Sequence, residues 1–339
     1  MISKVKQPTV ADVAAHAGVS IGTVSNVLKG VIPVSSKTRE RVMTAITELD
    51  YRQNMLAQGL RSKRAPLVGL CVPHTKITYF AELVDCFEEV ASSNSYEILQ
   101  VLSRQDHERE YQRVKSLLNY RVSGLIIVPS MKPDATYELI QESGIATVVV
   151  DRAPSGEFAF DRVTFDNQAA MRQAGAGLLQ RGHRNILFVV HQRLLNVTVQ
   201  RIAGLQEAAA TYGNEVTTNV IECNDQTSLT AQLSLEMRRK NRPTAIIVSN
   251  SRIATWAYRA FKALNLDCPK DVSLVAFDEP EWADIVTPTL SVVRQPTREI
   301  ALMAWRFLLH RIAQDVDGIQ EIQLNAEVIF RNSVADLTR

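Results

Sequence analysis

The chain has 339 residues, and its 38 Lys and Arg against 36 Asp and Glu give a net charge of +2. With 46% hydrophobic and 22% charged residues, the composition is that of a folded globular protein and excludes a disordered or collagen-like chain. No apolar run approaches the ~18 residues of a membrane span, and the start Met-Ile-Ser-Lys has no signal-peptide core, so we expect a cytoplasmic protein without a membrane partner.

Two short helices separated by a tight corner are predicted over residues 9–28. An apolar stripe at helical spacing marks the first helix: Val10, Val13, Ala14 and Ala17. Gly18 can adopt the left-handed conformation that ends this helix without a Cβ clash. Ser20 can cap the second helix by accepting a hydrogen bond from a backbone N–H of its first turn.

The second helix has a bare outer face. Its apolar side is formed by Val24, Val27 and Leu28, which leaves Ile21, Gly22 and Asn26 on an outward arc. A short helix with such a face fits the major groove of DNA, where an Asn amide can pair with adenine N6 and N7. Two helices with a glycine corner also occur in ordinary all-α cores, so this pattern alone is a moderate signal.

A third helix follows, with Ser35 as its predicted N-cap and an apolar stripe formed by Val42, Ala45, Ile46 and Leu49. Residues 1–65 hold ten Lys and Arg against four Asp and Glu, a local charge of +6, whereas the remaining residues sum to −4. A basic head on a mildly acidic body is expected when only the head meets phosphates.

The run from Thr9 to Arg64 resembles the headpiece and hinge of the lac repressor family of bacterial transcription regulators. The matching pieces lie without a gap at the family's spacings: Asp12-Val13-Ala14, Ala17-Gly18-Val19-Ser20, Thr23-Val24-Ser25, Val34-Ser35, Thr38-Arg39, Glu48-Leu49-Asp50-Tyr51, Asn54, Ala57 and Leu60. The resemblance implies a helix-turn-helix that binds operator DNA, and a hinge helix over Asn54–Leu60 in which Ala57 and Leu60 enter the minor groove and Leu60 kinks the duplex.

Three groups of residues are therefore expected at the DNA. We assign base contacts to Ile21, Gly22 and Asn26; the family often has Arg at the place of Asn26, so the operator sequence is expected to differ. Phosphate contacts or helix caps are expected at Thr9, Ser20, Thr23, Ser25, Ser35, Thr38 and Tyr51. The hinge contributes Asn54, Ala57 and Leu60.

From Leu67 onward, short apolar runs alternate with helical stretches, as in parallel sheets covered on both faces. Strands are predicted over Leu67–Val72, Glu97–Leu102, Gly124–Val128, Ala146–Asp151, Asn185–Val190, Val220–Cys223, Ala245–Ser249 and Ser273–Asp278. The series appears once over 67–151 and again over 185–278, which predicts two doubly wound parallel-sheet lobes. The tail adds a strand at Leu290–Val293, a helix near 296–314 and a strand at Val328–Arg331.

The fold class is thus an N-terminal all-α headpiece followed by two α/β lobes, and the resemblance implies lobes like those of type I periplasmic sugar-binding proteins. The expected domains are a headpiece over 1–50, a hinge over 51–65, a first lobe over 66–164 with 296–323, and a second lobe over 165–295 with 324–339.

An effector site is expected between the lobes, at the carboxyl ends of strands. Asp151 and Asp278 end apolar strands, where an unpaired carboxylate is costly unless a cleft solvates it or a partner binds it. The resemblance places Arg201 in this pocket as a ligand-binding arginine, together with Asn250 and the aromatic pair Tyr79 and Phe80. For each of them a structural cap, an ion pair or a core position is the alternative.

We find no catalytic constellation in the sequence. There is no Walker loop, no Gly-x-Gly-x-x-Gly after the first strand and no Ser-His-Asp or His-Glu-x-x-His arrangement, and the four cysteines lack metal-ligand spacing. We expect no metal or other cofactor, and reduced thiols. Gly175 and Gly177 lie in a helical pattern and are expected to allow close packing.

The predicted function is a ligand-responsive repressor of a sugar or related catabolic operon. Its expected partners are double-stranded operator DNA, a sugar, sugar acid or related metabolite, and a second copy of the chain. The alternative is a small-molecule-binding or metabolic α/β protein whose N-terminal helices do not bind DNA.

Overall fold

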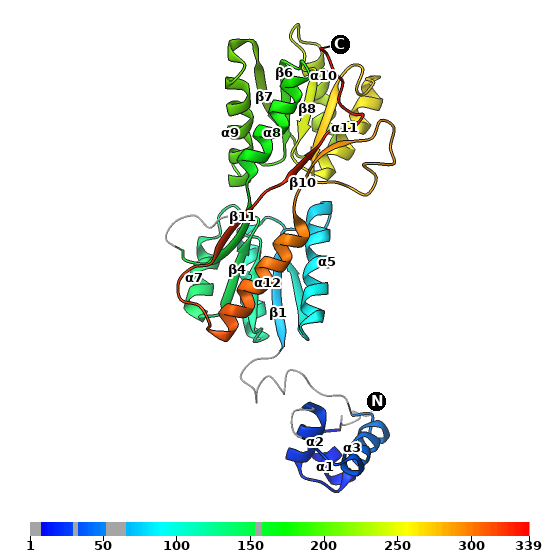
Figure 1. Ribbon diagram of the computed structural model, residues 1–339, viewed down its shortest axis with the longest axis vertical. Coiled ribbons are helices and arrows are strands. Elements are labelled where there is room, and N and C mark those ends of the chain that lie inside the picture. The colour runs from blue at the N-terminus through cyan, green and yellow to red at the C-terminus, as the bar shows by residue number, and fades with distance from the viewer. Residues whose placement is uncertain (1–7, 30–32, 52–65, 153–157, 339) are drawn as a thin grey trace, which may run out of the picture. The chain divides into compact units, whose positions relative to one another are not determined.

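The computed structural model describes residues 8–29, 33–51, 66–152 and 158–338. The chain divides into two compact units, residues 1–65 and residues 66–339, shown in Figure 1. The predicted hinge residues Asn54, Ala57 and Leu60 lie outside the described residues.

The N-terminal unit contains the three predicted helices: α1 (Val10–Ala17), α2 (Ile21–Lys29) and α3 (Ser36–Glu48). Its core is formed by small apolar side chains from all three helices: Val13, Ala14, Ala17, Val24, Val27, Val42 and Ala45. The predicted stripes of the first and third helices therefore meet one another, because i, i+3, i+4 spacing places them on single helix faces.

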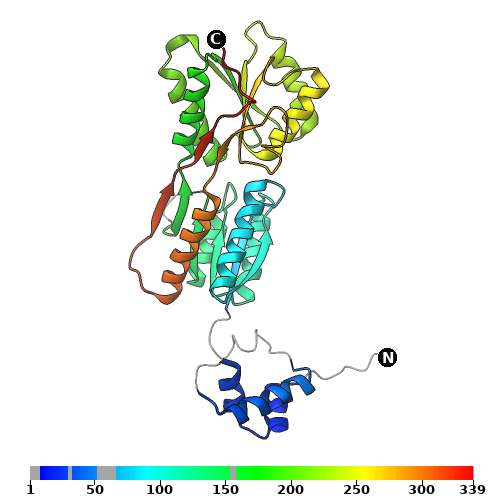
Figure 2. The same cartoon turned by 45° about the vertical axis from the view of Figure 1, so that its right-hand side comes forward.

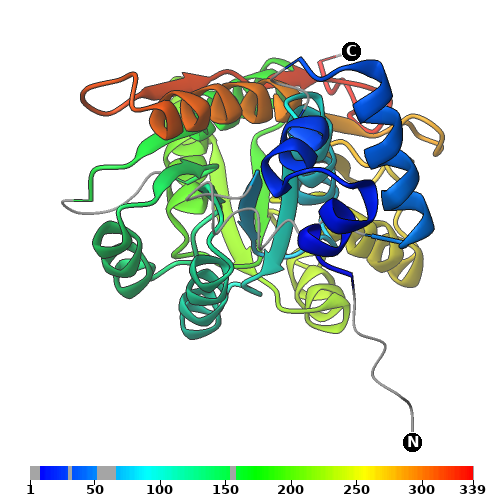
Figure 3. The same cartoon turned by 90° about the horizontal axis from the view of Figure 1, so that it is seen from below.

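The first lobe is built on a six-stranded sheet of order β11-β5-β4-β3-β1-β2 in which all pairs are parallel. Its strands are β1 (Leu67–Val72), β2 (Glu97–Leu102), β3 (Gly124–Ile127), β4 (Ala146–Val150), β5 (Asp161–Phe165) and β11 (Glu321–Leu324). The covering helices are α5 (Thr78–Ser93), α6 (His107–Asn119), α7 (Asp134–Ser143) and α12 (Thr297–Ala313). One apolar core lies under α5 and α12 and another under α6 and α7, on opposite faces of the sheet (Figure 3).

The second lobe repeats this architecture with the sheet order β12-β10-β9-β8-β6-β7. Its strands are β6 (Asn185–Val190), β7 (Thr217–Glu222), β8 (Ala245–Val248), β9 (Ser273–Phe277), β10 (Ser291–Arg294) and β12 (Glu327–Ile329). Its helices are α8 (Asn167–Gln180), α9 (Asn196–Ala210), α10 (Gln226–Met237) and α11 (Ser251–Leu264), with a 3₁₀ turn at Gly213–Glu215. In the described residues, β10–β12 is the antiparallel pair of this sheet, and the other pairs are parallel.

Three segments connect the two lobes, as Figures 1 and 2 show: β5 to α8, β10 to α12, and β11 to β12. The two doubly wound lobes predicted from the sequence are confirmed. Gly175 and Gly177 also pack as expected, since a Cβ at Gly175 would lie 3.0 Å from Leu205 and one at Gly177 would lie 2.3 Å from Phe330.

The sequence does not predict strands β5 and β11. Strand β11 alternates polar and apolar residues at the sheet edge and is half exposed, so it lacks the apolar run of a central strand. Both strands are fixed by long-range polar contacts: the buried Asp161 carboxylate accepts from Arg311 at 2.6 and 2.9 Å and from the Gln320 N–H at 2.8 Å. Arg162 and Glu321 form an ion pair across β5 and β11 at 2.6 Å.

Candidate functional site

The corner between α1 and α2 has the predicted geometry. Gly18 is left-handed at φ +62°, and Val19 continues the turn by donating to the Ala14 carbonyl at 3.0 Å. The guanidinium of Arg41 on α3 donates to the carbonyls of Ala17 at 2.6 Å and Gly18 at 3.3 Å. A Cβ at Gly18 would lie only 2.7 Å from Arg41 Nη2. Glycine therefore permits both the left-handed turn and the hydrogen bonds from Arg41.

The exposed face of α2 carries the predicted base-contacting residues. Ile21 is 43% exposed and Gly22 is exposed, whereas Val24 and Val27 on the opposite face are buried. Asn26 is half-buried one turn further along. The arc expected from the sequence is therefore present, with a short apolar and amide surface that a major groove can admit.

The predicted phosphate contacts include three helix caps. Ser20 and Ser35 accept from the N–H groups of Thr23 at 3.1 Å and Thr38 at 3.2 Å. Thr9 caps α1, where its Oγ1 lies 3.4 Å from the Asp12 N–H. These caps leave Thr9, Ser20 and Ser35 exposed, so the same hydroxyl groups and helix N-termini can also face phosphates.

Ser25 and Tyr51 complete the described DNA-binding predictions. Both side chains are half-buried. Tyr51 packs against the headpiece core, and its N–H donates to the Ile46 carbonyl at 3.0 Å. Tyr51 thus has a structural role in this unit besides any contact with DNA.

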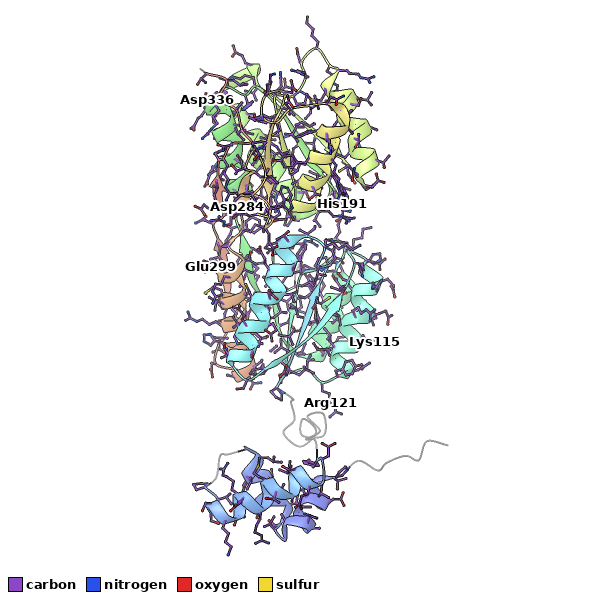
Figure 4. All side chains as sticks on the ribbon, turned by 90° about the vertical axis from the view of Figure 1, so that its right-hand side faces the viewer. Lys115, Arg121, His191, Asp284, Glu299 and Asp336 are labelled. Carbon is purple, nitrogen blue, oxygen red and sulfur yellow. The ribbon has the colours of Figure 1, made fainter. Side chains whose placement is uncertain are left out.

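A second site lies between the two lobes of the C-terminal unit, at the carboxyl ends of their strands. This cavity and its mouth hold about 580 Å³ of open space. All six residues that the sequence assigned to an effector lie in its wall: Tyr79, Phe80, Asp151, Arg201, Asn250 and Asp278. His191 marks the side of the second lobe that faces the first (Figure 4).

Arg201 on α9 is held rigidly in the wall of the second lobe. Its Nε donates to Asn167 Oδ1 at 2.7 Å and its Nη1 to the Ser249 carbonyl at 2.9 Å. The guanidinium lies over the Phe277 ring at 3.8 Å from the centroid. Burial lowers the pKa of Arg201 to about 10, while the charges of Asp278 and Asp151 act in the opposite direction, so the side chain remains a cation at pH 7.

The two aspartates occupy equivalent places in the two lobes. Asp151 follows β4 at φ +68° and Asp278 follows β9 at φ +66°, a conformation that a short polar side chain tolerates. Burial raises the pKa of both, that of Asp278 to about 6. Asp278 accepts from the Ser251 N–H at 3.3 Å and from the Gln295 amide, so a charged form has partners.

Several polar atoms in the cavity wall form no hydrogen bond within the described residues, although one of them, Arg152 Nε, is ion-paired with Asp151 at 3.3 Å. They are His74 Nδ1, Tyr79 OH, Arg152 Nε and Gln295 Oε1. Buried polar atoms are nearly always hydrogen-bonded in folded proteins, so the three atoms without a hydrogen bond or an ion pair among the described residues are consistent with water or another polar occupant in the cavity. The group contains donors and acceptors, and burial lowers the pKa of His74 to about 4, which makes this imidazole neutral at pH 7.

Besides Arg201 and Asp278, Asp151 has a structural contact in its ion pair with Arg152 at 3.3 Å, and so do Asn250 and Phe80. Asn250 Oδ1 caps α11 by accepting from the Ile253 N–H at 3.0 Å. Phe80 packs edge-on against His74 and Tyr79 at 5.5 and 5.0 Å between ring centroids. The alternatives of a cap and a core position therefore apply to Asn250 and Phe80 in addition to their place in the cavity.

The structure adds polar wall residues that the sequence did not single out: His74, Gln105, Arg152, His191, Gln192, Thr198 and Gln295. Arg152 and Gln295 could have been predicted from the sequence. Arg152 directly follows Asp151, which was already assigned to the cavity, and Gln295 directly follows strand β10. The others lie on loops and on α9, where nothing in the local sequence separates a wall residue from a surface residue.

Within the described ranges, no group of three or more His, Cys, Asp or Glu side chains is placed to hold a metal ion. Within those same ranges, no helix has the length and apolarity to cross a membrane.

The sequence models of two families match this chain. The model of bacterial regulatory proteins of the lacI family matches residues 9–54, and the model of a periplasmic binding protein-like domain matches residues 176–334. The chain is 30% identical over 332 residues to the HTH-type transcriptional repressor PurR of Erwinia tasmaniensis, with 97% of each chain covered. It is 30% identical over 331 residues to catabolite control protein A of Priestia megaterium, with 96% of this chain and 98% of the relative covered.

Two solved structures show the same architecture. A lac repressor dimer bound to operator and the anti-inducer ONPF matches with a TM-score of 0.84 and 26% identity, over 97% of this chain and 100% of that one. A complex of the transcriptional regulator CelR with cellobiose matches with a TM-score of 0.71 and 25% identity, over 96% of this chain and 99% of that one.

Proposed function

This chain belongs to the lacI family of bacterial regulatory proteins, and from that premise we propose which residues bind DNA and which bind the effector. The protein is a ligand-responsive transcriptional repressor with an N-terminal helix-turn-helix and a periplasmic-binding-protein-like effector domain. Its partners are operator DNA, a small-molecule effector and a second copy of the chain. The alternative of a metabolic protein without DNA binding is not supported.

For the DNA, we propose that Ile21, Gly22 and Asn26 face base edges in the major groove. The observation that supports this is the exposed face of α2 above a buried Val24 and Val27. The hydroxyl groups at the three helix starts then face phosphates. The hinge residues Asn54, Ala57 and Leu60 remain a proposal drawn from the family resemblance.

For the effector, the carrying observation is that Asp151, Arg201 and Asp278 line one interlobe cavity together with His74, Tyr79 and Gln295, each of which has a polar atom without a hydrogen bond in the described part of the chain. Hydroxyl groups both donate and accept, so a compound with several of them can serve the carboxylates, the guanidiniums and the unpartnered atoms at once. We therefore propose a sugar, a sugar acid or a related metabolite, bound by Tyr79, Phe80, Asp151, Arg201, Asn250 and Asp278.

The domain boundaries remain a proposal. We propose a headpiece over 1–50, a hinge over 51–65, a first lobe over 66–164 with 296–323, and a second lobe over 165–295 with 324–339.

An effector that contacts both lobes changes their spacing, and in a dimer this changes the free energy of ordering the two hinges on DNA. We also propose that the protein catalyses no reaction and acts in the cytoplasm at the nucleoid.

A thermal-shift screen followed by an operator-binding assay tests this function. The panel contains D-ribose, cellobiose, D-gluconate, sugar phosphates and nucleobases, and the DNA is a pool of genomic fragments. We expect a hydroxyl-rich compound to raise the Tm and to change the affinity for one fragment. A protein that retards no fragment above the random background contradicts the repressor function, whereas a Tm raised only by nucleobases contradicts the effector class.

A further inference from the structure

A buried carboxylate lies behind the effector cavity and has no part in the function proposed so far. Glu110 on α6 is completely buried. Its carboxylate accepts from the backbone N–H of Ser130 at 2.5 Å and from the Ser130 hydroxyl at 3.0 Å. Ser130 belongs to the loop between β3 and α7, so one side chain on a helix fixes this loop.

The same loop holds an arginine of the cavity wall. The carbonyl of Pro129, next to Ser130, accepts from Arg152 Nη1, which also donates to Gln105 Oε1 at 2.9 Å. Arg152 Nε forms an ion pair with Asp151 Oδ2 at 3.3 Å, so the same guanidinium links the loop to the Asp151 carboxylate. Gln105, Asp151 and Arg152 all line the cavity, whereas Glu110 does not.

We propose that Glu110 is a positioning residue for effector binding. Its carboxylate holds the loop after β3 so that the Pro129 carbonyl fixes the Arg152 guanidinium in the cavity wall. Arg152, paired with Asp151 at 3.3 Å, thereby holds that carboxylate in the cavity wall, where it can accept from a hydroxyl group of the effector. This inference rests on the proposed role of the cavity as the effector site.

The charge of Glu110 is matched to this task. Burial raises its pKa to about 7, and the two hydrogen bonds from Ser130 and the positive charge of Arg152 oppose that rise. Only the ionised carboxylate accepts through both oxygens in charge-assisted hydrogen bonds; protonation turns one oxygen into a donor, so the Ser130 hydroxyl contact must reverse and both contacts lose the charge of Glu110. The polar and titratable groups that act on this region come from β1, α6, α7, the loop after β3 and the loop after β4: Cys71, Arg113, Ser130, Asp134, Thr136, Tyr137, Asp151 and Arg152.

A purely structural role for Glu110 makes a different prediction. If the carboxylate only stabilises the loop, its loss changes the free energy of unfolding and leaves the environment of Arg152 as it was. If it positions Arg152, the guanidinium responds to the charge on Glu110 in the folded protein. Glu110→Gln keeps the shape of the side chain and removes the charge, and Glu108→Gln on the exposed face of α6 is the matched control.

The first experiment observes the Arg152 Nε–Hε signal by NMR in the full-length protein labelled with ¹⁵N-arginine, without any added compound. The signal is assigned by its loss in Arg152→Lys. We expect it to move between pH 5.5 and 8.5 with a midpoint near 7, to keep this titration in Glu108→Gln and to lose it in Glu110→Gln. The same titration in Glu110→Gln as in the wild type would overturn the proposal.

A second experiment measures affinity by calorimetry for whichever of D-ribose, cellobiose or D-gluconate binds. We expect Glu110→Gln to weaken binding about tenfold, and the double variant with Arg152→Lys to bind no more weakly than Arg152→Lys alone. Fully multiplying losses would overturn the proposal, because independent residues give additive free energies. If none of the three compounds binds, the NMR titration decides the role of Glu110, and the thermal-shift panel decides the effector class separately.

Discussion

Replacing Arg201 with alanine separates its structural contacts from its proposed role in effector binding. The wild-type side chain donates two charge-assisted hydrogen bonds, to Asn167 and to the Ser249 carbonyl, and stacks on Phe277. Each such bond contributes about 1.5–3 kcal/mol to stability, and the stacking about 0.5–2 kcal/mol.

A second effect acts against these contributions. Burial lowers the pKa of Arg201 from 12.5 to about 10. At about 1.4 kcal/mol for each pKa unit, burying the cation costs roughly 3 kcal/mol. Subtracting this cost from about 3.5–8 kcal/mol for the two bonds and the stacking leaves roughly 0.5–5 kcal/mol, and water in the cavity can rehydrate Asn167 and Ser249, so we expect a loss of about 1–3 kcal/mol in the free energy of unfolding.

The loss of effector affinity should be larger than the loss of stability. Without Arg201, the cavity lacks the cation opposite Asp151 and Asp278 and the donor that reaches the effector from the second lobe. We expect affinity to fall by about 2–4 kcal/mol, which is two decades or more. Operator binding without effector should survive, because residues 1–65 form a compact unit of their own.

Urea unfolding, calorimetry and an operator gel shift with and without effector measure these three quantities. Arg311→Ala is the matched control: it removes both bonds to the buried Asp161 but does not line the cavity, so it should lower stability and leave affinity unchanged. A folded Arg201→Ala protein that keeps its full effector response would refute the site assignment. If that variant does not fold, Arg201→Lys decides, because it keeps the charge and cannot donate in the same fork.

Four further outcomes are expected. Asn26→Arg should change the base preferred at one symmetric position of each half-site, by roughly 1–3 kcal/mol, in a selection from random operators; an unchanged motif means that Asn26 does not read a base. Leu60→Ala should weaken specific binding and reduce the DNA bend with little change in salt slope, whereas an unchanged bend and affinity exclude a wedge. Sedimentation should give a dimer, since one short recognition helix reads too few base pairs for a specific site, and a stable tetramer would contradict this. Because burial raises the folded-state pKa of Asp278 to about 6, its contribution to stability is present below pH 4 and is lost as pH rises through 6. Asp278→Asn should therefore flatten the dependence of the unfolding free energy on pH between about 4 and 6. An unchanged slope would show that another group causes this dependence.

The elements with local signals could be predicted from the sequence. The caps at Ser20 and Ser35 and the left-handed Gly18 depend on residues within one turn, so their spacing is sufficient to place them. Central strands such as β1, β3 and β8 are buried on both faces and therefore appear as continuous apolar runs. These runs also placed Asp151 and Asp278 at strand ends, and thus in the cavity.

The edge and crossing segments could not be predicted in the same way. Strand β11 (Glu321–Leu324) joins the first sheet beside β5, and β12 (Glu327–Ile329) joins the second beside β10, although only two residues separate them. No local propensity distinguishes these two destinations. They are decided by distant partners such as Asp161, whose carboxylate receives Arg311 and the Gln320 N–H.

The sequence by itself determined the helix-turn-helix, the two α/β lobes and the six residues expected at the effector, because each depends on short-range spacing, on buried strand runs or on the family resemblance. Only the tertiary structure decided what surrounds them. His74, Arg152 and Gln295 come from three different strand ends and complete the cavity wall, and Glu110 reaches Arg152 through a loop 20 residues along the chain. Such contacts depend on how whole helices and strands pack against one another. The hydrophobic pattern of the sequence predicts the elements but does not indicate which polar side chains this packing brings together.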